Sequence, residues 1–172
     1  MRDEILRHGG ARGARWYDAM ANASEAFADD RERDAIRILR PVRRALPRAP
    51  SVRELLGLSL YRAGQYEAAA EELEVYAEIT GEVDQHHVMM DCARALGNSK
   101  RVDELWAELA AVSPSSELVT EGRIVLAGSL ADRDRLAEAV AMLGRRASGS
   151  VKKIQTHHLR LWYALEIGRA HV

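Results

Sequence analysis

The chain has 172 residues, of which 47% are hydrophobic and 30% charged, and its formal net charge is −1. This composition excludes a disordered tail, and the near-zero charge argues against nucleic-acid binding by the chain as a whole. No apolar run approaches the roughly 18 residues that a membrane span needs, the N-terminus lacks a signal-peptide core, and the single Cys92 cannot form an internal disulfide, so we expect a cytoplasmic protein.

The N-terminal residues 1–13 contain three glycines and predict a loose segment with at most a helical turn at 2–7. From there on, apolar residues recur at helical spacing, and no strand pattern is present. The expected helices cover 15–28, 32–46, 51–63, 67–79, 84–96, 101–112, 116–131, 135–146 and 154–166. Ser51, followed by Glu54 three residues later, predicts a capping box at the start of the third. The fold class is therefore expected to be all-α.

Three residue positions recur at an interval of 34 residues. They pair Ala35 with Ala69, Leu39 with Leu73, and Pro47 with Gly81. A fixed period in this range is the sequence signature of repeat architectures, in which each unit buries its apolar face only against its neighbours. A non-repetitive helical bundle is the alternative, because amphipathic helices alone would also produce apolar residues at i, i+3, i+4 and i+7.

The segment at about 50–82 resembles a tetratricopeptide repeat (TPR), a helix–turn–helix unit of about 34 residues. Gly57 and Ala69 occupy the small positions where two helices cross closely, Leu56 and Leu60 are core positions, and Gly64-Gln65-Tyr66 matches the turn. Weaker copies place further packing positions at Ala23, Ala35, Leu39, Trp106, Ala127, Ala139 and Leu143. The resemblance implies a right-handed α-solenoid over residues 14–165, with about four repeats and the first helix of a fifth, in a bacterial TPR-containing protein.

In the TPR family, the first helix of each repeat lines a concave groove that holds a protein or peptide partner. Carried over by register, the groove residues are Tyr17, Ser24, Glu54, Leu58, Tyr61, Arg62, His87, Asp91, Arg94 and Glu121, while Phe27 fits the core better. The resemblance therefore implies a non-enzymatic interaction scaffold. The alternative is the sensor or interaction domain of a larger regulatory protein whose effector part is missing.

Two charged runs lie on expected second helices. Residues 31–48 contain seven arginines, and residues 67–78 contain five glutamates. We expect both to be solvated outer faces with some pairing between neighbouring repeats. A basic strip for RNA or an acidic partner is the alternative, although no aromatic residues are interleaved with the arginines as stacking on bases requires.

Residues that could carry chemistry do not form a recognisable site. Adjacent histidines at 86–87 and 157–158 diverge by about 100° on a helix, so each pair offers one convenient ligand where zinc needs three or four. Cys92 sits within an expected helix as a small apolar residue, without an oriented base. No nucleophile elbow, phosphate-binding loop or HExxH motif occurs. We expect no metal, no cofactor and no enzymatic activity.

The last seven residues, Glu166 to Val172, do not continue the apolar spacing that Trp162 and Leu165 begin. One back-translation of them reproduces the start of a common sequencing adapter followed by a stop codon, so we expect a non-native tail at 166–172 and a truncated natural chain. A fifth-repeat helix without its partner would leave Trp162 exposed, which predicts fraying or self-association through this uncapped helix.

Overall fold

The computed structural model describes residues 1–144, and the regular elements in this range are all helical. The elements are α1 (Arg2–Gly9), a 3-10 turn (Gly10–Arg12), α2 (Gly13–Ala28), α3 (Glu32–Ala45), α4 (Pro50–Arg62), α5 (Tyr66–Thr80), α6 (His86–Ala95), α7 (Ser99–Val112), α8 (Ser116–Ala131) and α9 (Leu136–Gly144). From α2 to α8, the expected helix ends agree with these bounds to within two residues. The expected helix at 154–166 and the proposed tail at 166–172 lie outside the described residues.

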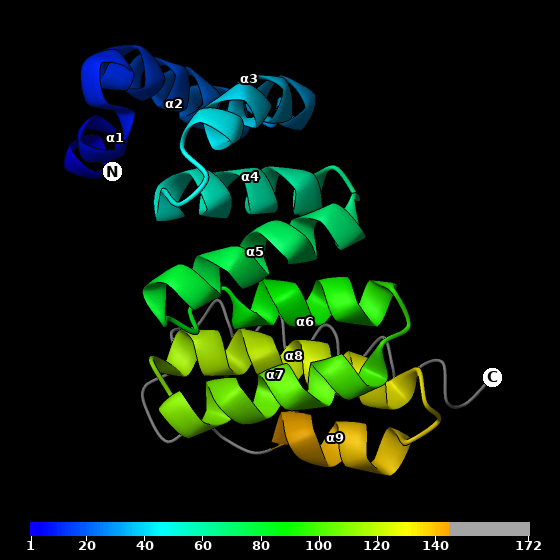
Figure 1. Cartoon of the computed structure of the whole chain (residues 1–172). Coiled ribbons are helices and arrows are strands. Elements are labelled where there is room, and N and C mark those ends of the chain that lie inside the picture. Colours follow the sequence, from blue (N-terminus) through cyan, green and yellow to red (C-terminus); the bar gives the residue numbers. More distant parts are fainter. Residues whose placement is uncertain (145–172) are drawn as a thin grey trace.

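Figure 1 shows α1, α2 and α3 together at one end of the molecule, followed by α4, α5 and α6, with α7 and α8 overlapping in this view and α9 at the other end. Consecutive helices are joined by short turns and pack on each other, so each pair is an antiparallel hairpin. The first helices of the pairs also contact one another: α2 contacts α4, α4 contacts α6, and α6 contacts α8. The second helices α3, α5, α7 and α9 do not pack on one another to a comparable extent within residues 1–144. The first helices therefore form one continuous row.

The hairpin turns of the four pairs share one backbone conformation. The first helix of each pair ends in a Schellman motif, in which a left-handed residue donates to the carbonyl three residues back and the next residue donates to the carbonyl five residues back. The left-handed residues are Asp30 (φ 55°), Gly64 (φ 73°), Gly97 (φ 72°) and Asp134 (φ 58°). The hydrogen bonds to the carbonyl five residues back run from Arg31 to Ala26, Gln65 to Leu60, Asn98 to Ala93 and Arg135 to Leu130, at 2.8–2.9 Å. Aspartate thus replaces glycine in two of the four turns, because short polar side chains tolerate this conformation.

The expected packing positions lie in the core or at its edge. A Cβ added to Gly57 would lie 2.7 Å from the Cγ and Cδ2 atoms of Leu73, so α4 and α5 approach closely there because residue 57 has no side chain. Trp106 and Leu143 are partly buried. The other positions are buried: Ala23, Ala35, Leu39, Leu56, Gly57, Leu60, Ala69, Leu73, Ala127 and Ala139.

The loose segment expected over 1–13 is instead largely the helix α1. Its Ile5 is fully buried in the core formed with α2, α3 and α4. Glu4 accepts hydrogen bonds from the backbone N–H of Ser51 (3.1 Å) and from its hydroxyl (2.9 Å). The capping box expected at Ser51 and Glu54 is therefore wrong, because the carboxylate that caps α4 comes from α1.

Truncating Ile5 to alanine should lower the free energy of unfolding by about 2 kcal/mol or more, because the loss of a fully buried side chain leaves a cavity under α1. Leu6→Ala is the control, since Leu6 is 38% exposed, and it should cost about 1 kcal/mol at most. Urea unfolding followed by circular dichroism measures both variants. Equal, small effects would mean that α1 does not dock on the core.

No helix within residues 1–144 has the length and apolar character needed to cross a membrane.

Candidate interaction face

Several of the residues expected to line a groove connect successive first helices to one another. Tyr61 on α4 donates a hydrogen bond to Asp91 on α6, with an oxygen–oxygen distance of 2.6 Å. Burial, together with Asp91, raises the pKa of the Tyr61 hydroxyl. This hydroxyl is therefore protonated at neutral pH and acts as a donor between α4 and α6. We call the row of predicted groove residues on α2, α4, α6 and α8 the first-helix face.

The two arginines expected to bind a partner are engaged within the chain. The Arg62 guanidinium lies 3.8 Å from the centroid of the Phe27 ring and donates to the Phe27 carbonyl (3.1 Å) and to Asp30 (3.3 Å). Because Asp30 is the left-handed residue of the first turn, Arg62 ties the second hairpin to the turn of the first. Arg62 therefore acts first as a link between hairpins.

Arg94 makes the corresponding link farther along the chain. Its Nε atom donates to Asp132 at the end of α8 (2.6 Å). A Cβ added to Gly128 would meet the Arg94 guanidinium at 2.6 Å, so the guanidinium rests on α8 where residue 128 has no side chain. Both arginines expected at the groove thus make contacts between successive hairpins.

Two of the expected groove residues line a pocket of about 430 Å³ between α1, α2, α4 and α5. Ser24 and Glu54 contribute polar groups to its lining, and Met20 and Tyr76 contribute a large apolar and a large aromatic side chain. The Glu54 carboxylate accepts a hydrogen bond from Gln85 (2.8 Å). Burial raises the pKa of Glu54, although the hydrogen bond from Gln85 opposes the shift. This volume is in the range of pockets that hold small ligands or inserted side chains.

The remaining expected groove residues differ in how far they are covered. His87 is mostly buried, and burial lowers its pKa although Glu121 of α8 opposes the shift. Its Nδ1 atom has no hydrogen-bond partner among the described residues. Leu58 is half-buried against the core around Leu73, so it contributes mainly to packing. Tyr17 is half-buried, and the Arg2 guanidinium lies 5.8 Å from the centroid of its ring.

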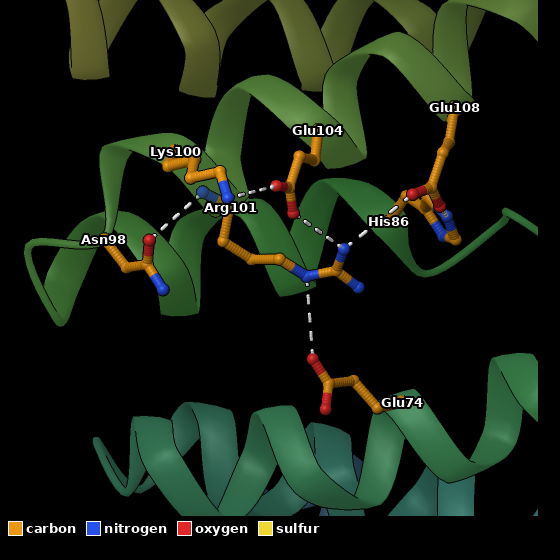
Figure 2. A network of polar contacts seen from close by, with 7 residues as sticks. All are labelled: Glu74, His86, Asn98, Lys100, Arg101, Glu104 and Glu108. Carbon is orange, nitrogen blue, oxygen red and sulfur yellow. Dashed lines mark hydrogen bonds and ion pairs between the residues drawn. The ribbon is translucent and has the colours of Figure 1, made fainter.

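A second polar cleft lies between α5 and α7, away from the predicted groove residues (Figure 2). Arg101 lies at its centre and makes ion pairs with Glu74 (3.6 Å), Glu104 (3.3 Å) and Glu108 (3.7 Å). Glu108 also lies 2.9 Å from Nε2 of the buried His86. This network joins α5, α6 and α7 through side chains that are already paired, as expected of a stabilising contact.

The expectation that the glutamates of residues 67–78 are all solvated is wrong for Glu72. Its side chain is only 6% exposed and accepts hydrogen bonds from Arg43 on α3 (2.8 Å) and Arg53 on α4 (2.5 Å). The residue occupies the inner side of α5 beside Ala69 and Leu73. Its burial therefore depends on two arginines that reach it from different helices.

The candidate chemical groups do not converge in the described residues. Within residues 1–144, no group of three or more histidines, cysteines, aspartates or glutamates is placed to hold a metal ion. His86 faces Glu108 on α7, whereas His87 is influenced by Glu121 on α8. Burial raises the pKa of the Cys92 thiol to about 12, which keeps it protonated at neutral pH. The pair at 157–158 lies outside the described residues.

No protein-family model matches the chain, and no curated protein shows similarity to it.

Proposed function

We propose that the chain is a TPR-like solenoid whose first-helix face binds a protein partner, and that the chain performs no chemistry itself. The observation that carries the proposal is the repeated hairpin, with the same two turn hydrogen bonds in each of four helix pairs. Repeated hairpins that stack through their first helices produce an extended face, and such faces are the binding surfaces of solenoid proteins.

The charge of the first-helix face favours a basic partner segment. Its arginines at 62 and 94 are paired with Asp30 and Asp132, so they contribute little positive charge to an incoming ligand. Glu54, Asp91 and Glu121 supply acidic groups, and Tyr17 and Tyr61 supply half-buried aromatic area. Aromatic rings with complementary charges are the usual anchors of a protein interface. A partner segment with lysine or arginine beside an apolar side chain fits this combination.

A charge placed in the pocket beside Glu54 tests the proposal. Ser24→Arg directs an arginine into the pocket, and Asn22→Arg adds the same charge at an exposed position of the same helix. Immobilised wild-type protein and both variants are incubated with cell extract, and bound proteins are compared by quantitative mass spectrometry. The best candidate is then purified and titrated against each variant.

We expect the partner to bind wild type and Asn22→Arg with similar affinity and Ser24→Arg at least about tenfold more weakly, because the added cation fills the pocket and repels a basic segment. Circular dichroism checks that both variants retain their helix content. A partner that binds all three proteins equally would place the interface elsewhere and contradict the proposal.

A further inference from the structure

The outer sides of α3 and α5 carry opposite charges at the same repeat positions. The arginines of α3 are Arg33, Arg37, Arg40 and Arg44, and the glutamates of α5 are Glu67, Glu71, Glu74 and Glu78. Each glutamate follows its arginine by 34 residues, and all eight residues are exposed. We call these two sets the arginine stripe and the glutamate stripe. The repeat thus keeps the positions of four charges and reverses their sign.

Each stripe runs straight along its helix. The spacing i, i+4, i+7, i+11 places all four side chains on one side, and the buried residues of α3 and α5 occupy the opposite side. At 1.5 Å of rise per residue, each stripe is about 16 Å long. Both helices are second members of antiparallel hairpins, so they run in the same direction. Equivalent charges on the two stripes therefore lie at the same level along the helices.

The two stripes are separated by a groove of about 330 Å³. Arg40 and Arg44 line one side of it, Glu71 lines the other, and Leu56 of α4 contributes to its floor. At its base, a hydrogen bond from the partly exposed Arg43 to the buried Glu72 joins the helices.

Most charges of the stripes are not used within the described chain. Arg37 pairs with Asp34 of its own helix (3.1 Å), and Glu74 reaches Arg101 on α7 (3.6 Å), which Figure 2 shows. The other stripe residues make no ion pair within residues 1–144. These are Arg33, Arg40, Arg44, Glu67, Glu71 and Glu78. Six of the eight stripe charges therefore have no ion-pair partner within residues 1–144 and are exposed to an incoming partner.

We propose that a second copy of this chain docks on the two stripes and forms a symmetric homodimer. A two-fold axis that lies between α3 and α5 and parallel to them places the arginine stripe of each copy on the glutamate stripe of the other. This rotation leaves the level along the helices unchanged, so Arg33 meets Glu67 of the second copy and Arg44 meets Glu78. A two-fold axis that lies in the plane of the interface but runs perpendicular to the helices would instead place arginines on arginines and glutamates on glutamates.

The charge pattern is what selects a second copy as the occupant. An RNA would be attracted by the arginine stripe but repelled by the adjacent glutamate stripe. An acidic peptide would leave the glutamates unmatched, whereas a rotated copy of the same surface matches both rows at once and closes the assembly. This surface is formed by second helices, so it is separate from the first-helix face. A failed partner experiment and a failed dimer experiment are therefore distinguishable.

Exposed ion pairs are screened by salt, which gives the dimer a characteristic behaviour. We expect the full chain to sediment at twice 19.1 kDa in about 20 mM salt at protein concentrations of about 100 μM, and as a monomer in about 0.5 M salt. The dissociation constant should rise by at least about 100-fold between these two conditions, because several pairs are screened together.

Charge reversal gives the sharper test. An acidic variant changes the four stripe arginines to glutamate, and a basic variant changes the four stripe glutamates to arginine. Each variant should be monomeric in low salt, since its two stripes then repel those of a second copy, and an equimolar mixture should form a heterodimer. A variant with both stripes reversed should dimerise like wild type. The control changes exposed arginines on other elements to glutamate with the same change in net charge: Arg2, Arg7, Arg12 and Arg15.

Several results would overturn the proposal. Wild type could remain monomeric in low salt, or the acidic variant could dimerise as wild type does, which would place the interface elsewhere. Retention of RNA that disappears in the acidic variant, without any dimer, would assign the arginine stripe to nucleic acid. Should a fourfold variant unfold, Arg44→Gln with Glu78→Gln removes one matched kind of contact, between residue 44 of each copy and residue 78 of the other, without introducing repulsion. This milder pair of changes should weaken the dimer about tenfold, and an unchanged dissociation constant would equally contradict the proposal.

Discussion

Replacing Glu72 by glutamine should lower the free energy of unfolding by about 3 kcal/mol. The carboxylate is buried between Arg43 and Arg53, and the Arg53 side chain is itself only 12% exposed. Without the carboxylate, the Arg53 guanidinium remains buried beside a neutral amide that cannot compensate its charge. Breaking one member of a buried ion pair is costly for this reason, even where the intact pair adds little net stability.

The matched control for this change is Glu71→Gln, one residue earlier on the same helix. Glu71 is exposed and makes no ion pair within residues 1–144, so its replacement should change stability by less than about 0.5 kcal/mol. Urea unfolding in about 0.5 M salt, where contacts of the charged stripes are screened, measures both variants. Equal effects of the two substitutions would show that Glu72 is solvated and that its contacts with Arg43 and Arg53 do not form.

Enlarging Gly57 should cost about as much as removing Glu72. In Gly57→Leu the new side chain must occupy the space held by Leu73, which is fully buried and cannot move to solvent. We expect a loss of about 3 kcal/mol, because overpacking a closed crossing forces the two helices apart. Leu73→Ala alone should also cost about 3 kcal/mol, through the cavity that it leaves.

The double variant Gly57→Leu with Leu73→Ala separates packing from other effects. The new leucine can enter the space that residue 73 vacates, so the double variant should be more stable than the sum of the single losses by at least about 1 kcal/mol. Thermal or urea unfolding of the four proteins completes the cycle. Additive losses would mean that the two positions do not face each other across the α4–α5 hairpin.

Features that depend on neighbouring residues in the sequence were predictable. The apolar spacing and the turn residues place the ends of α2 to α8, because helices and Schellman turns are specified by residues within a few positions of one another. The resemblance to a tetratricopeptide repeat also placed Gly57 and Ala69 at small positions, and both are buried at the α4–α5 crossing. The third turn could also be predicted, because a glycine, Gly97, occupies its left-handed position.

Features that depend on distant residues were not predictable. α1 buries a single large residue, Ile5, which is too short a pattern to distinguish from a loose segment. Glu72 looks like its exposed neighbours in sequence, and only the convergence of Arg43 and Arg53 explains its burial. The expected groove arginines have partners 32 and 38 residues away, so spacing along one helix could not show that they are engaged.

The central claim is that hairpins of the same geometry stack so that their first helices adjoin. Nuclear Overhauser effects in solution test it directly. The account predicts cross-peaks from the α-protons of Gly57 to the methyl groups of Leu73, within a hairpin, and from the α-protons of Gly128 to the side chain of Arg94, between hairpins. If these resonances are assigned and both cross-peaks are absent, neither the hairpin nor the stack exists as described.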